Sequence, residues 1–115
     1  MKFVVLLHQD ERIWAEADAD ERARYIREHD DFSAAAAATP GVEILGGEAL
    51  TSVASATTLR RRGDQVTITE GPYAETVEQL GGFYLIEAPD LDVLTSLLPR
   101  LPEYTLEIRP VADVP

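Results

Sequence analysis

Two segments of the chain are apolar at every position, "FVVLL" at residues 3–7 and "FYLI" at residues 83–86. Side chains of a β-strand point alternately to opposite faces of the sheet. A strand that is apolar at every position therefore belongs to a sheet with two buried faces. The chain has only two helical patterns, and two helices cover one face of a small sheet. A second copy of the protein is the simplest cover for the other face, so we predict a homodimer that packs sheet against sheet.

The remaining patterns define the order of elements in a single domain of residues 1–115. A strand at 2–8 precedes a helix of about 18–20 residues, capped by Asp18 or Asp20 and stopped by Pro40-Gly41. The later elements are a strand at 42–50, a hairpin at 56–69 turning at Gly63-Asp64, a strand at 82–88, a short helix at 91–98 capped by Asp90 and a strand at 105–111. We also expect one or two helical turns around Glu75–Leu80, ended by a left-handed cap at Gly81-Gly82. This order predicts an α+β fold, a ferredoxin-like split βαβ unit with one additional strand pairing.

The composition excludes several classes of function. The formal net charge of −11 argues against nucleic-acid binding, which requires a cationic surface. The chain has no cysteine and only two histidines, so we expect no metal site, and it has no phosphate loop or serine-centred elbow. No apolar run approaches the ~20 residues of a membrane span, and the apolar start is too short for a signal peptide. We expect a cytoplasmic protein without membrane partners or cofactors.

Glu70 at the end of the hairpin is the first candidate for a functional group. With the turn at Gly63-Asp64, Leu59 lies opposite Ile68 and Thr57 lies opposite Glu70. Glu70 continues the apolar parity of Ile68 and would point inward, where a carboxylate needs a hydrogen-bond or charge partner. The alternative is that the strand has already ended and Glu70 faces water.

His29 is the second candidate, because it interrupts an apolar stripe of the long helix. The stripe consists of residues at helical spacing: Tyr25, Ile26, His29, Phe32, Ser33 and Ala36. His29 is either a packed, hydrogen-bonded core residue or an imidazole that moves protons in a pocket. In the second interpretation, an inward carboxylate such as Glu70 would fix its tautomer.

Three further residues are candidates for binding a substrate. Trp14 is either the wall of a pocket or a cover for the core beside the first strand. Arg60 shares a hairpin face with Thr67 and Thr69, and either binds an anion or keeps the sheet solvated. Tyr73 follows the Gly-Pro corner and, with Trp14, could line an apolar pocket.

The assembled pattern resembles the YCII-related family, specifically its DGPF branch. The resemblance spans nearly the full length and is carried by "MKFVVLLHQDERIW", "REHDDF", "GGEAL", "ATTLRRRGDQVTITEGPYAETVEQLGGFYLIEAPDLD" and "LEIRPV". The Asp-Gly-Pro-Phe motif that names the branch is Glu70-Gly71-Pro72-Tyr73 here, and Val77 stands where relatives commonly have lysine. The second helix is also short, ended by Pro99.

The resemblance implies a dimeric α+β barrel with an active-site cleft in which a His–Asp pair is suspected of acid–base work. By position, His29 matches the helix histidine of the family and Glu70 matches the aspartate of the motif. One related member is thought to be a dehydrochlorinase acting on a ring-cleavage product, which needs a base and no cofactor. Some members of the branch are encoded beside sigma factors, which implies a regulatory accessory role.

Two hypotheses of different class follow. The first is a cofactor-independent acid–base enzyme, lyase-, dehydrohalogenase- or isomerase-like, acting on a small organic acid. Its catalytic residues would be His29 and Glu70, with Trp14, Arg60 and Tyr73 binding the substrate. The second is a non-catalytic dimeric module that binds a small ligand or a protein partner. Other dimeric α+β barrels include haem proteins and cofactor-free monooxygenases, but neither histidine is singled out as a haem ligand.

Overall fold

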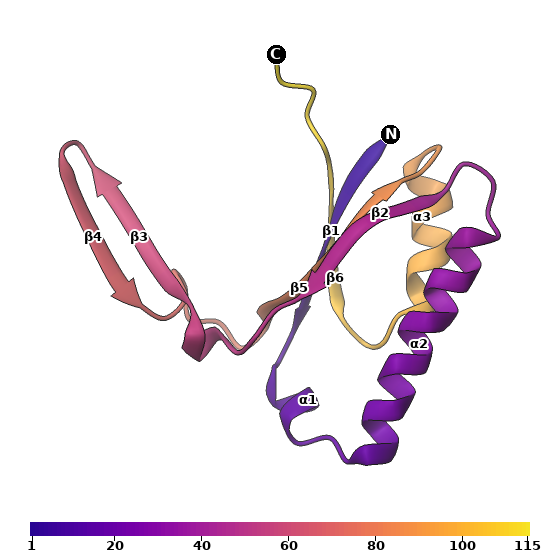
Figure 1. Cartoon of the computed structure of the whole chain (residues 1–115), viewed down its shortest axis with the longest axis horizontal. Helices are drawn as coiled ribbons and strands as arrows, with labels where there is room; N and C mark the ends of the chain where they lie inside the picture. Colours follow the sequence, from indigo (N-terminus) through magenta and orange to yellow (C-terminus); the bar gives the residue numbers. More distant parts are fainter.

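The computed structural model covers residues 1–115 and contains a four-stranded antiparallel sheet, two main helices and a separate hairpin (Figure 1). The sheet has the order β2-β5-β1-β6. Its strands are β1 (Lys2–Gln9), β2 (Glu43–Ala49), β5 (Gln79–Glu87) and β6 (Thr105–Pro110). The helical elements are α1 (Arg12–Ala15), α2 (Ala19–Ala37), α3 (Leu91–Leu97) and the 3-10 turns η1 (Val53–Ser55) and η2 (Leu98–Arg100). The order and pairing of these elements confirm the predicted α+β, ferredoxin-like fold.

Both main helices begin at aspartate caps that the sequence predicts. The Asp18 carboxylate accepts a hydrogen bond from the backbone N–H of Glu21 at 2.8 Å, and Asp90 accepts one from Val93 at 2.8 Å. Each cap satisfies a backbone donor that the first turn of a helix leaves without a partner. After α2, Gly41 has a φ of +79°, which reverses the chain toward β2.

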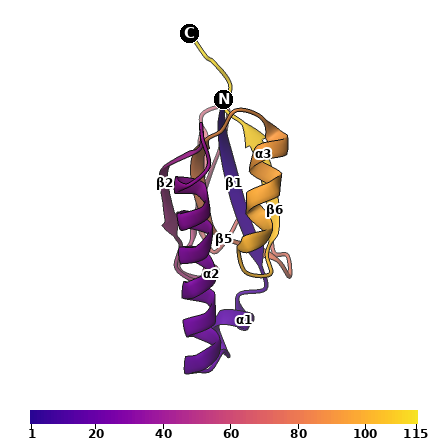
Figure 2. The same ribbon diagram turned by 90° about the vertical axis from the view of Figure 1, so that its right-hand side faces the viewer.

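The hydrophobic core lies on one face of the sheet. Phe3, Val5 and Leu7 alternate along β1, and all three are buried under α2 and α3. Figure 2 shows the two helices side by side over this face. Phe32 of α2 and Leu94 of α3 are fully buried against it. The predicted limit of two helices is thus confirmed: they cover a single face.

The opposite face of the sheet carries no helix (Figure 1). Its centre is formed by Val4 and Leu6 of β1 and their partners Leu85 and Phe83 of β5. Val4, Leu6 and Leu85 are partly exposed in the single chain. The face has the composition of a buried layer, and the homodimer that would cover it stays a prediction.

The hairpin of β3 (Thr57–Arg62) and β4 (Gln65–Glu70) projects from the sheet on the side away from α2 and α3 (Figure 1). Its register is as predicted, with Leu59 opposite Ile68 and Thr57 opposite Glu70. Gly63 in the turn has a φ of +59°, a conformation that glycine adopts without steric cost. Every residue of β4 is exposed, including Glu70. The prediction of an inward-pointing Glu70 is therefore wrong for the single chain, because no other element packs on its face.

The predicted helical turns around Glu75–Leu80 are absent. This segment consists of bends that lead into β5 from Gln79. Neither Gly81 nor Gly82 has a positive φ, so they form no left-handed cap. Gly81 lies at a bulge against β1, while a Cβ on Gly82 would come within 2.9 Å of the Glu48 carbonyl oxygen of β2. Strand pairing on both sides of β5 outweighs the local helical preference of this segment.

Candidate functional site

A pocket of about 600 Å³ lies at the end of the sheet, beside the first half of α2. Its walls come from the end of β1, from α1, from the end of β2 with the residues after it, and from the start of β5. Five aromatic side chains belong to its wall: Trp14, Tyr25, Phe83, Tyr84 and Tyr104. An apolar, concave site with a few convergent polar groups is the usual form of a small-molecule site.

His29 lies in this pocket, and both nitrogens of its ring contact tyrosine hydroxyls. Nδ1 lies 2.6 Å from the hydroxyl of Tyr84, and Nε2 lies 2.8 Å from the hydroxyl of Tyr104. Tyr84 is on β5, one position from Phe83, so that its ring points to the helix-covered face. Tyr104 directly precedes β6. Helix α2, strand β5 and the segment before β6 thus hold one Tyr–His–Tyr array, Tyr84–His29–Tyr104.

Burial shifts the protonation equilibria of all three groups toward their neutral forms. Burial lowers the pKa of His29, and the nearby carboxylates of Asp30 and Glu28 only partly oppose this effect. Burial raises the pKa of Tyr84 and raises that of Tyr104 to about 12. Near pH 7 the array therefore consists of a neutral imidazole and two neutral phenols.

A neutral imidazole donates from one nitrogen and accepts at the other. Whichever nitrogen of His29 carries the proton, one tyrosine donates its hydroxyl proton to the ring and the other accepts the ring proton. The accepting tyrosine keeps its own proton for another acceptor, and the donating tyrosine keeps lone pairs for another donor. The array can thus give a proton at one end and take one at the other.

The aromatic wall is held in place by further contacts. Gln9 donates from Nε2 to the Tyr25 hydroxyl at 3.0 Å and to the carbonyl of Glu103 at 3.2 Å. The Tyr25 ring packs edge-on against Trp14 and Tyr104, with ring centroids 6.0 and 6.3 Å apart. Such edge-to-face pairs are favourable and restrict the rings to one orientation.

Trp14 belongs to the pocket wall, which was one of its two predicted placements. It sits on α1, an element that the sequence analysis did not anticipate. The guanidinium of Arg22 lies 4.9 Å from its ring centroid and also donates to its carbonyl oxygen at 3.1 Å. The Trp14 ring is thereby fixed at the pocket, although it is partly exposed.

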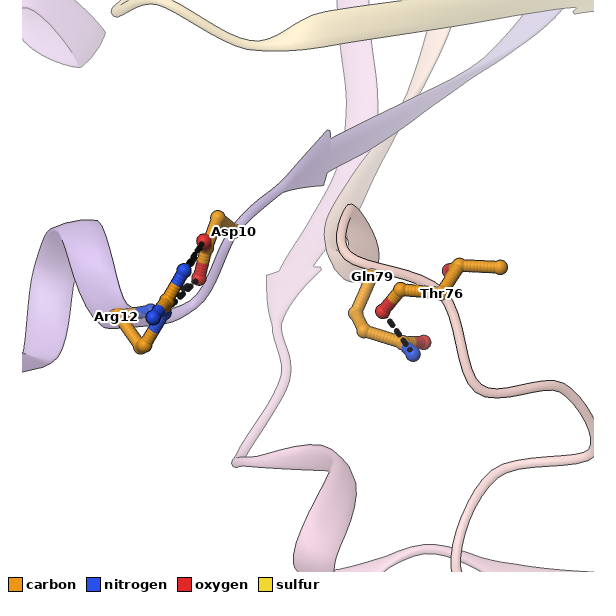
Figure 3. A network of polar contacts seen from close by, with 4 residues as sticks. All are labelled: Asp10, Arg12, Thr76 and Gln79. Atoms are coloured by element: carbon orange, nitrogen blue, oxygen red, sulfur yellow. Dashed lines mark hydrogen bonds and ion pairs between the residues drawn. The ribbon is translucent and has the colours of Figure 1, made fainter.

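Polar contacts also hold the loops that frame the pocket. In Figure 3 the Arg12 guanidinium pairs with the Asp10 carboxylate, with a shortest distance of 2.6 Å, at the start of α1. These hydrogen bonds lower the pKa of Asp10. At the start of β5, Gln79 donates from Nε2 to the carbonyl of Thr76 at 2.8 Å and so orders the segment before β5 (Figure 3).

Glu11 connects the two sides of the pocket through hydrogen bonds. Its carboxylate accepts from the hydroxyl of Ser52 at 2.8 Å and from the backbone N–H of Val53 at 3.1 Å. Glu11 and Glu48 are the acidic residues of the lining, and no lysine or arginine lines the pocket. An anionic ligand would find no cationic side chain of this chain in the pocket.

Glu70, Arg60 and Tyr73 do not line the pocket. Glu70 is exposed at the end of β4, and both nitrogens of His29 are occupied by tyrosines, so the expected contact between Glu70 and His29 is not formed within the chain. Arg60 instead donates to the carbonyl oxygen of Tyr73 at 3.0 Å, and the Tyr73 side chain is 81% exposed. The physical reason is that the hairpin leaves the sheet on the side opposite α2 (Figure 1). None of these three residues contacts the pocket within the chain, so their predicted roles stay predictions.

Sequence reasoning missed Tyr84 and Tyr104. Tyr84 lies inside the apolar run "FYLI", on the same parity as the buried Ile86. A tyrosine on a core-facing position needs a partner for its hydroxyl, and that requirement was the available signal. No comparable signal marks Tyr104.

Comparison with known proteins shows which family this chain belongs to. The model of the YCII-related domain matches residues 1–114 of this chain. This protein belongs to the YCII-related family. An uncharacterized protein of Rhizobium meliloti (strain 1021) is 34% identical over 120 residues, which cover 97% of this chain and 93% of that protein. None of the helices of this YCII-related protein combines the length and the apolar composition of a membrane span, and no cluster of three or more potential metal-ligating side chains occurs.

Proposed function

We propose that this protein is a cofactor-independent acid–base enzyme, isomerase- or lyase-like, in which His29 relays a proton between Tyr84 and Tyr104. The observation that carries the proposal is the pair of hydrogen bonds, 2.6 and 2.8 Å long, that joins both ring nitrogens to hydroxyls at the wall of one pocket. Glu70, which sequence analysis placed beside His29, has no part in this version of the mechanism.

The proposed step is a closed proton transfer. With the ring proton on Nδ1, Tyr104 donates to Nε2 and Tyr84 accepts from Nδ1. A proton leaving the ligand goes to the Tyr104 oxygen while the Tyr104 proton moves to Nε2. At the same time the Nδ1 proton moves to Tyr84, whose own proton passes to a second atom of the ligand. The ligand loses one proton and gains one, and the ring ends in the opposite tautomer.

This transfer suits the electrostatics of the pocket. Burial disfavours both an imidazolium at His29 and phenolates at the tyrosines, as the directions of their pKa shifts indicate. A concerted relay leaves none of these ions behind. An isomerase would return the proton to a different atom of the substrate, and a lyase would deliver it to a leaving group.

The lining favours an uncharged ligand over the organic acid suggested by sequence. Its charged members are the carboxylates Glu11 and Glu48, and the neutral form of His29 adds no positive charge. The aromatic wall of Trp14 and Tyr25 favours a flat, largely apolar molecule. We therefore propose a small neutral compound with one acidic C–H or O–H group as the substrate.

A non-catalytic ligand-binding module is the second candidate. One observation favours it: neither nitrogen of His29 is free to touch a ligand directly. In that case the array would only orient the aromatic wall and bind a ligand through the tyrosine hydroxyls. The two candidates differ in whether a bound ligand exchanges protons with the array.

The proposal includes a homodimer packed sheet against sheet. The support is the uncovered face around Val4, Leu6, Phe83 and Leu85, whose apolar character requires a cover. A cytoplasmic location stays a prediction.

The proposal can be tested before the substrate is identified. Small neutral compounds that bind are found by quenching of the fluorescence of Trp14, the single tryptophan, and are then incubated with the protein in D₂O. The expected result is deuterium incorporation into at least one bound compound, detected by NMR. His29→Gln and Tyr104→Phe should abolish the incorporation while retaining binding. Tyr73→Phe is the matched control, because that ring lies outside the pocket. If compounds bind but show neither deuterium incorporation nor turnover, the protein is the non-catalytic ligand-binding module instead.

A further inference from the structure

The β3–β4 hairpin is an arm without a partner in its own chain. Leu59, Val66 and Ile68 are 60, 55 and 66% exposed, although they form a continuous apolar face. A two-stranded hairpin with an uncovered apolar face is marginally stable in water by itself. The arm therefore requires a cover that the single chain does not supply.

The two faces of the arm differ in chemistry. Arg61 pairs with Val66 and Leu59 pairs with Ile68, so these four side chains share one face. The other face carries polar side chains: Thr58, Arg60, Thr67 and Thr69. Only the first face has the composition of an interface centre, an apolar cluster with Arg61 at one end and Glu70 at the other.

The arm and the uncovered sheet face lie on the same side of the molecule. The hairpin extends on the side of the sheet away from α2 and α3 (Figure 1). That is also the side to which Leu6 and Phe83 point. A body that covers the sheet face would therefore lie next to the arm as well.

The charges point to a second copy of this chain as that body. The arm, residues 57–70, contains three of the ten basic residues and only two of the 21 acidic ones. The rest of the chain is therefore strongly acidic. The three guanidiniums of the arm donate only to backbone carbonyls: those of Tyr73, Gly63 and Arg61. Arm and body are thus complementary in charge.

The pocket provides an acidic contact close to the uncovered face. Glu48 pairs with Phe83 across β2 and β5 and lines the pocket, yet its carboxylate makes no hydrogen bond or ion pair. Phe83 and Tyr84 point to opposite faces of the sheet, and both line the pocket. The pocket thus reaches around the end of the sheet to the face that a second copy would cover.

We propose that the β3–β4 hairpin is a clasp: in the homodimer each copy lays the face of Leu59, Val66 and Ile68 on the other copy, with Arg61 of that face against carboxylates of the other copy. This inference extends the homodimer of the proposed function and is independent of the proton relay. The clasp adds arm-to-body contacts to the sheet-to-sheet contact.

A pair of variants on opposite faces of the same strand tests the clasp. Ile68→Asp places a charge in the apolar face, and Thr67→Asp places the same charge one residue away on the polar face. Sedimentation equilibrium should give a dimer for the wild type and for Thr67→Asp. The dissociation constant of Ile68→Asp should rise by at least about thirtyfold, because an interface hot spot is lost. The proton NMR signals of the helix-covered core should be unchanged, since the arm covers no core residue.

Removal of the arm provides an independent test. The N–H of Gly71 donates to the carbonyl of Ala56 at 2.7 Å, so the two roots of the arm are adjacent and residues 57–70 can be replaced by a short glycine linker. The shortened chain should keep the proton NMR signals of a folded core and should dimerise more weakly than the wild type. A dimer equally tight without the arm, or insensitive to Ile68→Asp, would overturn the clasp while leaving the sheet-to-sheet dimer. A wild-type monomer would overturn both, and neither outcome would affect the deuterium-exchange test of the relay.

Discussion

The helix-covered core and the hairpin arm have the same kind of apolar pattern and opposite environments. Leu94 on α3 is fully buried, whereas Leu59 on β3 is 60% exposed. The difference arises because α3 returns across the sheet and meets α2, while the arm leaves the sheet and meets no other element (Figure 1). An apolar pattern tells which residues share a face, but a cover for that face comes from elsewhere in the chain or from another molecule.

The largest expected effect compares the same substitution in the two regions. Leu94→Ala should lower the free energy of unfolding by about 2–5 kcal/mol, because it leaves a cavity in the core. Leu59→Ala should change it by less than about 0.5 kcal/mol at concentrations where the chain is monomeric. Urea unfolding followed by circular dichroism gives both values. Equal losses in the monomer would show that the arm packs on its own body.

A second comparison uses two glycines of the sheet. Gly82→Ala should cost about 1–3 kcal/mol, because the added Cβ would approach the Glu48 carbonyl oxygen to 2.9 Å. Gly46→Ala is the control, since nothing lies within 4 Å of its added Cβ. A tolerated Gly82→Ala, measured by the same unfolding experiment, would contradict the close approach of β2 and β5.

A third comparison uses one tyrosine of the pocket, Tyr104, and one that follows the hairpin arm, Tyr73. Tyr104→Phe removes a hydrogen bond from His29 and should cost about 1 kcal/mol. Tyr73→Phe should leave stability within about 0.5 kcal/mol, because its ring is 81% exposed and its hydroxyl has no partner. If thermal unfolding ranks the two variants in the opposite order, the array does not hold the site together.

The smallest expected effect is on the pH dependence of stability. The pKa of His29 is lowered below its ordinary value of 6.5, so the unfolded chain binds a proton at a higher pH than the folded chain does. The stability contribution of His29 is therefore complete above about pH 6.5 and is lost as the pH falls through the folded pKa. His29→Gln should show a flatter stability profile below about pH 6.5. An NMR titration in which His29 has a pKa above 6.5 would contradict this.

Much of the fold could be predicted because its signals are local. Asp18 and Asp90 cap the helices as expected, and the turn at Gly63-Asp64 sets the register of the arm correctly. The segment around Glu75–Leu80 was predicted as helix because its capping pattern was considered without its strand partners. His29 was found as a candidate because a polar residue interrupts an apolar stripe.

The amino-acid sequence by itself determined the main strands and helices, the aspartate caps, the hairpin turn, the two-sided apolar strands and the family of this protein. Only the tertiary structure decided that His29 meets Tyr84 and Tyr104, which are 55 and 75 residues away, and that the arm leaves the body. Caps, turns and strand parity depend on neighbours within a few residues, so the sequence displays them. The partners of a side chain in a pocket depend on how strands that are distant in the sequence pack against one another. The spacing of residues along the sequence does not show that packing.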